Sequence, residues 1–206
     1  MKYYILRETI KKPYFTPFEL KLKGFKVFPY QLSFWIRKGR IGKIKRSLYY
    51  FTSEKEKISG EEVSFLLYGP SYISLESALS HYGFIPDLVQ VETAVTAKTT
   101  RTFSNDFGRF IYRHIKKDLF FGYVSIETEN AKYLLAEPEK AILDYFYLNL
   151  GQINNQTDLD ELRINYTEVK KRINPAKIKR YLKAFQINKL AEIIKLILKN
   201  VNSGTN

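Results

Sequence analysis

Apolar residues in the first part of the chain recur at helical spacing and are separated by helix-ending residues. Apolar positions three or four apart predict a helix over residues 1–11. Thr16, Pro17 and Glu19 then form a capping box with proline at the first helical position, so a second helix is expected to begin at Pro17. Gly24 is expected to end it, because glycine tolerates the left-handed conformation at a helix terminus.

A third helix is predicted over residues 29–38, followed by Gly39 as its stop. We expect Tyr30 and Phe34 to point inward, together with Trp35 or Ile36. Two short β-like runs follow, and they contain Ile41, Ile44, Leu48 and Tyr50 on either side of Lys45-Arg46-Ser47. Two helices followed by a basic hairpin are typical of a winged helix-turn-helix, in which the second of these helices enters the DNA major groove.

The hydrophobic pattern changes near Phe51, and residues 52–60, which are polar, charged and closed by glycine, are expected to form a linker. We therefore expect a winged helix-turn-helix domain over residues 1–52 and a second domain over residues 61–206. The second domain is predicted to be mixed α/β, with an antiparallel sheet and C-terminal helices, which makes the whole chain α+β. Its predicted helices cover residues 61–68, 74–82 (with Ser74 as N-cap), 137–149, 174–185 and 187–201, and its predicted strands cover residues 89–96, 100–103, 109–115, 119–126 and 133–135.

Charge is distributed very unevenly along the chain. Residues 1–52 carry 13 Lys and Arg against two acids, residues 53–162 carry 10 against 17, and residues 163–206 carry 11 against two. Because phosphate neutralisation releases condensed counterions, such basic ends favour a polyanionic partner. A basic face that is only solvated is the plainer alternative.

The candidate contacts follow from these positions. Gln31 and Ser33, near the start of the second helix of the pair, are the best candidates for base edges, and Tyr30 lies beside them with a role in either packing or binding. The predicted phosphate contacts are Arg37, Lys38, Arg40, Lys43, Lys45 and Arg46. A second polyanion surface is predicted at Lys170, Lys171, Arg172, Lys177, Lys179 and Lys183.

Several classes of protein are disfavoured by composition. The chain has no cysteine, which excludes disulfides and thiolate metal sites. The N-terminus lacks the apolar segment of a signal peptide, and the longest uncharged run, residues 63–75, is too short to span a bilayer, so a soluble cytoplasmic protein is expected. The sequence contains no phosphate-binding glycine motif and only two histidines, which are far apart.

Carboxylates at Glu137, Glu139 and Asp144 are the remaining catalytic candidates. Glu137 and Glu139 flank a helix start, where the helix dipole favours negative charge. Lys140 and Asp144 are expected to form an exposed i, i+4 pair on the same helix. We therefore expect no enzyme, no metal and no cofactor.

Three segments resemble the abortive-infection AbiEi antitoxin family. They are residues 70–86 (PSYISLESALSHYGFIP), the Thr99-Thr100-Arg101-Thr102-Phe103 hairpin segment, and residues 137–144 (EPEKAILD). They lie within a resemblance that spans about Phe15 to Leu150. The C-terminal residues are helical, as in that family, but do not match it position by position.

The resemblance implies a bacterial type IV toxin–antitoxin system that acts in phage defence. The winged domain would bind inverted repeats at its own promoter and repress the operon, with dimerisation on the DNA. The C-terminal domain would neutralise a nucleotidyltransferase toxin without requiring a stable complex. One departure concerns Ser47, since the family commonly carries glycine at this wing position. The alternative from the residues alone is an RNA- or ribonucleoprotein-binding module that uses the same basic domain.

Overall fold

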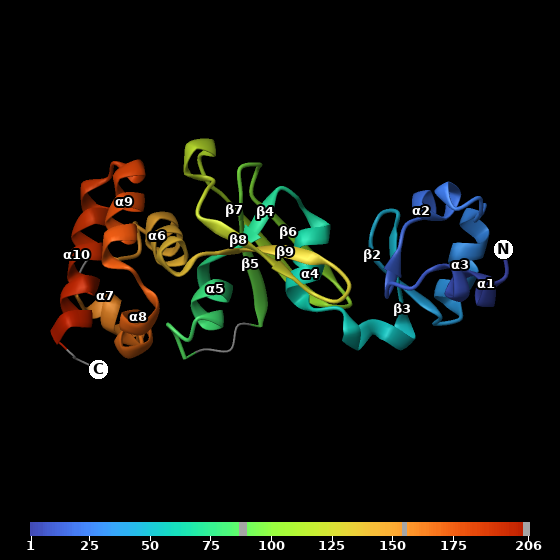
Figure 1. Ribbon diagram of the computed structural model, residues 1–206, viewed down its shortest axis with the longest axis horizontal. Coiled ribbons are helices and arrows are strands. Elements are labelled where there is room, and N and C mark those ends of the chain that lie inside the picture. Colours follow the sequence, from blue (N-terminus) through green and yellow to red (C-terminus); the bar gives the residue numbers. More distant parts are fainter. Residues whose placement is uncertain (87–89, 154–155, 204–206) are drawn as a thin grey trace.

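A computed structural model describes residues 1–86, 90–153 and 156–203. Helices and sheets are mixed, so the α+β class is confirmed. The chain is elongated: an N-terminal unit lies at one end, a six-stranded sheet in the middle, and a group of helices at the other end (Figure 1). Within the described ranges, no helix is both long enough and apolar enough to cross a membrane.

The N-terminal unit contains three helices and a three-stranded sheet. Thr16 accepts a hydrogen bond from the Glu19 amide at 3.0 Å, as the capping pattern predicts, and Gly24 follows the helix with φ of +81°. All the strand pairs are antiparallel, and β3 lies between the other two. In chain order the elements are α1 (Tyr3–Thr9), β1 (Tyr14–Phe15), α2 (Pro17–Leu22), α3 (Pro29–Arg37), β2 (Ile41–Lys45) and β3 (Leu48–Phe51).

The inward face of α3 differs from the expected one. Leu32 and Trp35 are buried in the core of the N-terminal unit, whereas Tyr30 and Phe34 are 69% and 40% exposed. The prediction was right for Trp35 and wrong for Tyr30 and Phe34. The error arises because α3 is apolar on most of its circumference, so that helical spacing alone does not decide which side faces the core. The other core residues are Leu6, Ile10, Phe15, Leu20, Ile41 and Phe51.

A 3-10 helix, η1 (Thr52–Lys57), and α4 (Gly60–Leu67) lead into the second unit. Its six-stranded sheet has the order β6-β7-β5-β4-β9-β8. β5 lies parallel to β7 and β4 parallel to β9, so the sheet is mixed and the antiparallel prediction was wrong. The strands are β4 (Ser71–Ile73), β5 (Val91–Thr96), β6 (Arg101–Asn105), β7 (Gly108–His114), β8 (Tyr123–Glu127) and β9 (Lys132–Ala136).

The C-terminal helices bury the apolar stripes that the sequence predicts. Ile178 and Phe185 on one helix, and Leu190, Ile194 and Ile197 on the next, are all buried. The predicted strand start at Val89 lies outside the described residues. The remaining elements are α5 (Leu75–His81), η2 (Lys117–Leu119), α6 (Pro138–Leu148), α7 (Gln156–Glu161), α8 (Tyr166–Arg172), α9 (Pro175–Phe185) and α10 (Asn188–Ser203).

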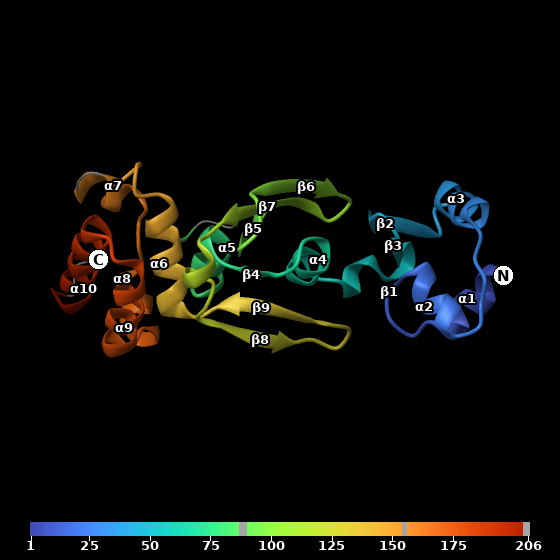
Figure 2. The same cartoon turned by 90° about the horizontal axis from the view of Figure 1, so that it is seen from above.

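The two hairpins of the larger sheet extend toward the N-terminal unit on either side of α4 (Figure 2). Tyr14, at the N-terminal unit's sheet, donates a hydrogen bond to the Asn130 carbonyl at the β8–β9 turn, at 3.1 Å. Asn105, at the β6–β7 turn, donates to the Ile44 carbonyl at 3.2 Å. Ile44 and Leu48 belong to the core of the larger unit. The three-stranded sheet is therefore covered by its own helices on one face and by the second unit on the other.

Candidate nucleic-acid interface

The N-terminal end of α3 is tied down by Gln31. Its side-chain oxygen accepts from the Phe28 amide at 3.0 Å, and its side-chain nitrogen donates to the Met1 carbonyl at 2.8 Å. Pro29 occupies the first helical position, where a missing amide proton costs nothing. Gln31 is thus engaged in local structure, while Ser33 and Tyr30, the other two predicted base contacts, are exposed.

Three cations lie at or just after the C-terminal end of α3. Arg37 and Lys38 lie 5.8 and 5.9 Å from the centre of the Phe34 ring, and Arg40 lies 5.0 Å from the Tyr3 ring. Arg37 and Arg40 also line a groove of about 900 Å³ between the start of α1 and α3. All three cations are exposed, so this end of the helix combines aromatic rings with positive charge.

The cations of the β2–β3 hairpin do not all point the same way. Lys43 shares a sheet face with Ile41, whose side chain packs against the helices. Lys45, beyond a β-bulge, donates to the Leu67 carbonyl of α4 at 3.3 Å, and burial, followed by the nearby Lys98, lowers its pKa. Arg46 is exposed at the turn. Lys45 is therefore committed partly to the contact between the units, which the sequence could not indicate.

The predicted C-terminal basic surface is partly neutralised by acids. Lys171 and Arg172 pair with Glu168 at 2.7 and 3.4 Å. Lys177 pairs with Glu137 at 2.9 Å and with Glu139 at 3.4 Å, and although burial opposes it, the bond to Glu137 raises its pKa.

Three other predicted cations form no ion pair among the described residues. Lys170, Lys179 and Lys183 are exposed. Lys179 also lines a groove of about 410 Å³ between α9 and α10, together with Lys195 and Lys199. The residues predicted for the basic surface lie on α8 and α9 only. The groove shows that α10 contributes lysines to the same surface.

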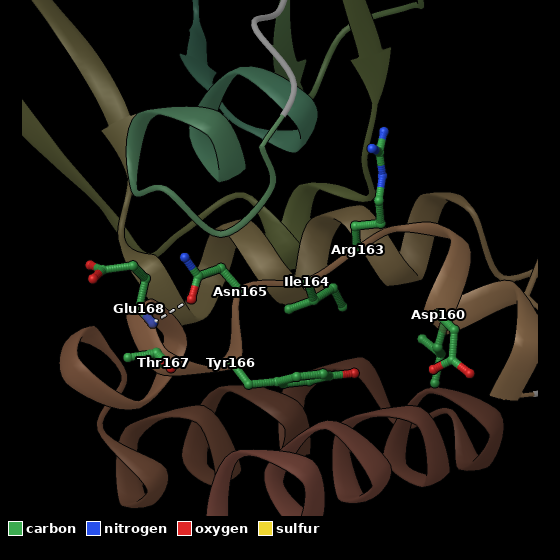
Figure 3. A pocket seen from close by; sticks show the side chains of 8 residues that line it. Asp160, Arg163, Ile164, Asn165, Tyr166, Thr167 and Glu168 are labelled. Atoms are coloured by element: carbon green, nitrogen blue, oxygen red, sulfur yellow. Dashed lines mark hydrogen bonds between the residues drawn. The ribbon is translucent and has the colours of Figure 1, made fainter. Parts of the chain in front are cut away.

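Another hollow, of about 670 Å³, lies where α7 ends and α8 begins (Figure 3). Asn165 caps α8 by accepting from the Glu168 amide at 3.1 Å, and Glu168 holds the two cations named above. Tyr166 accepts from the Asn200 side chain of α10 at 3.1 Å. These polar groups serve the local fold, and they form no nucleophile–base pair.

Two acidic sites of the second unit are fully or partly buried. Asp144 accepts hydrogen bonds from Tyr72 at 2.8 Å and Ser74 at 2.9 Å, and pairs with Lys140. Lys140 and Asp144 are fully buried, so the prediction of an exposed pair was wrong. Ser74 stands at the N-cap position of α5, but its hydroxyl donates to Asp144 instead of capping the helix.

The second acidic site is a small cavity of about 180 Å³ beside β5. Glu92 lines it with His81 and Ser77, and burial raises the pKa of Glu92 to about 7, with a smaller contribution from Glu61. Among the described residues, no group of three or more His, Asp or Glu side chains is placed to hold a metal ion.

No protein-family model matches the chain, and a search of curated proteins finds no significant match.

Proposed function

We propose that the chain is a DNA-binding transcriptional autorepressor that also acts as an antitoxin against a nucleotidyltransferase toxin, in a type IV, AbiEi-like toxin–antitoxin operon. Its N-terminal unit would be a winged helix-turn-helix, with α3 as the recognition helix and the β2–β3 hairpin as the wing. Inverted repeats at its own promoter would be the DNA target.

One observation carries the DNA-binding part of this proposal. The order α1-β1-α2-α3-β2-β3, with β3 between β1 and β2, is the order of a winged helix-turn-helix, and the unit that has it carries 13 Lys and Arg against two acids. None of the six proposed phosphate contacts forms an ion pair among the described residues, and Lys45 donates a hydrogen bond to the Leu67 carbonyl. The antitoxin part is supported by the resemblance of residues 70–86 and 137–144.

A salt titration on duplex DNA tests the first part. The upstream DNA of the operon and a scrambled duplex of equal composition would be compared by fluorescence anisotropy. With four phosphate contacts, log affinity should fall with log salt at a slope of about −4. Lys43→Glu with Arg46→Glu should abolish binding, whereas Lys116→Glu with Lys117→Glu, two exposed lysines of the second unit, should leave it intact. Equal affinity for both duplexes at every salt concentration would contradict a repressor.

A specific observation favours RNA as the alternative. Phe34 is exposed with the Arg37 guanidinium 5.8 Å from its ring centre, and Tyr30 is exposed on the same helix. Exposed aromatic rings and arginine are a common way to stack unpaired bases. The same titration with RNA hairpins separates the two, because a repressor should prefer its own duplex at raised salt.

The antitoxin part has its own test. Full-length protein carrying the Lys43→Glu and Arg46→Glu changes should still rescue cells that express the neighbouring toxin gene, since the proposed neutralising domain is untouched. Loss of rescue in a folded variant would show that the two activities are not separate.

A further inference from the structure

The outward face of α3 has an unusual composition for a helix that would enter a DNA groove. Tyr30, Ser33, Phe34 and Arg37 lie at positions i, i+3, i+4 and i+7, opposite the buried Leu32 and Trp35 pair. The Phe34 side chain is 40% exposed, and Arg37 and Lys38 both approach its ring. An apolar ring with two cations close to it thus lies within the exposed stripe.

The side chain best suited to adenine is already occupied. Gln31 is the only Asn or Gln in α3, and its amide bonds to Phe28 and Met1. A bidentate carboxamide contact to a base would require breaking both hydrogen bonds. What remains on the stripe for direct readout is two hydroxyls, one guanidinium and the Phe34 ring. In the major groove, the apolar group that an aromatic ring can recognise is the 5-methyl of thymine.

We infer that Phe34 is a specificity-determining residue that recognises thymine methyl groups in the major groove, and that the operator carries a thymine at that position in each half-site. This inference rests on the proposed DNA-binding function and deepens it. Arg37 and Lys38, whose charged groups lie 5.8 and 5.9 Å from the ring centre, would contact neighbouring phosphates, so the apolar contact is made beside two electrostatic ones.

Charge argues against a second copy of the chain as the occupant of this face. In a two-fold interface each surface meets its own copy. The cations beside Phe34 would then face their counterparts, on a unit whose 13 Lys and Arg are opposed by two acids. Like charges brought together in this way oppose association. Duplex DNA presents the opposite charge.

Replacing thymine by deoxyuridine removes the 5-methyl group that Phe34 is proposed to contact and leaves the rest of the base unchanged. The upstream duplex would be prepared with thymine and with deoxyuridine at every thymine position, and affinities measured at one salt concentration. Wild-type protein should bind the thymine duplex about fourfold more tightly for each methyl contact, the value for burying a CH2-sized group. Phe34→Ala should lose that affinity on thymine DNA and bind both duplexes equally. Phe34→Leu, which keeps an apolar side chain, should retain a preference for thymine.

Phe18→Ala is the matched control, because Phe18 is 67% exposed on α2 and lies outside the stripe. It should leave the thymine-to-deoxyuridine ratio at the wild-type value. Equal wild-type affinity for the two duplexes, with preference over scrambled DNA retained, would overturn the role of Phe34 and leave the repressor intact. No preference for upstream over scrambled DNA would overturn the repressor itself. A smaller sedimentation coefficient for Phe34→Ala with unchanged DNA affinity would assign the face to self-association.

Discussion

Tyr50 of β3 donates its phenolic proton to Asp106 in the β6–β7 turn, with 2.8 Å between the oxygens. The Tyr50 ring also packs edge-on against Phe107, with 4.8 Å between ring centres. Burial, reinforced by the bond to Asp106, raises the pKa of Tyr50 to about 12. This contact joins units that are distant in sequence, and it fixes the hairpin proposed as a wing against the second unit.

Gly42→Ala should disrupt this contact. A Cβ at position 42 would lie within van der Waals radii of the Tyr50 ring, which crosses the Gly42 backbone. The ring must shift, and overpacking of this kind typically costs about 1–3 kcal/mol of unfolding free energy, measurable by urea denaturation. Gly151→Ala is the control, because no atom lies near a Cβ there, and it should change little. Equal effects of the two substitutions would mean that the position of the Tyr50 ring does not depend on the absence of a side chain at residue 42.

The buried Lys140–Asp144 pair should be costly to break from one side. Asp144→Ala leaves a lysine without its counter-ion in the core, and losses of about 3–5 kcal/mol are expected for such changes. Lys140→Met with Asp144→Leu should recover much of this loss, because no buried charge remains. Urea denaturation of the single and double variants measures both effects.

Glu168→Gln, which breaks the exposed pairs with Lys171 and Arg172, is the control and should leave the denaturation midpoint unchanged. If the Lys140 and Asp144 double variant is no more stable than Asp144→Ala, the pair contributes through packing that hydrophobic side chains cannot replace.

This pair marks a limit of what the sequence can predict. An i, i+4 Lys–Asp spacing looks the same on an exposed and on a buried helix face. The partners that bury it, Tyr72 and Ser74, are about 70 positions away and are brought in by β4 and the start of α5. β4 itself has only three residues, too few for a periodic pattern, so its parallel pairing with β9 was not foreseen. Periodicity also does not show that two predicted strands, β5 and β7, pair in parallel.

Features that depend on neighbouring residues were predicted more reliably than the direction in which a side chain or helix face points. The Thr16 cap, the proline starts and the C-terminal apolar stripes depend on neighbouring residues, and all are found as expected. The inward side of α3 and the direction of Lys45 depend on the rest of the fold. The sequence therefore predicted the candidate surface but turned Phe34, the residue that we propose for base recognition, toward the core.

Glu92 should make stability fall as pH rises. The pKa of its carboxyl is about 7 in the folded protein and 4.5 in the unfolded reference, so between these values the unfolded chain releases a proton that the folded chain keeps. The stability that this group contributes is fully present below pH 4.5 and is lost by about pH 7. Glu92→Gln should therefore match wild type near pH 4 and exceed it above pH 7, by about 3 kcal/mol at most.

Urea denaturation across this pH range measures the difference. Glu127→Gln, at an exposed position of β8, serves as the control and should give a flat difference. A Glu92→Gln difference that is also flat would show that folding does not raise the pKa of the Glu92 carboxyl.

Ser47→Gly should stabilise the hairpin turn. Ser47 has φ of +61°, a conformation that costs a residue with a Cβ about 1–2 kcal/mol, whereas glycine adopts it freely. Part of the gain is lost to the greater freedom of glycine in the unfolded chain, so a net increase of up to about 1 kcal/mol in unfolding free energy is expected. Ser53→Gly, the same change in η1 at a residue without positive φ, should be destabilising. The opposite signs of the two substitutions in urea denaturation would attribute the gain to backbone conformation, and equal signs would contradict the strained turn.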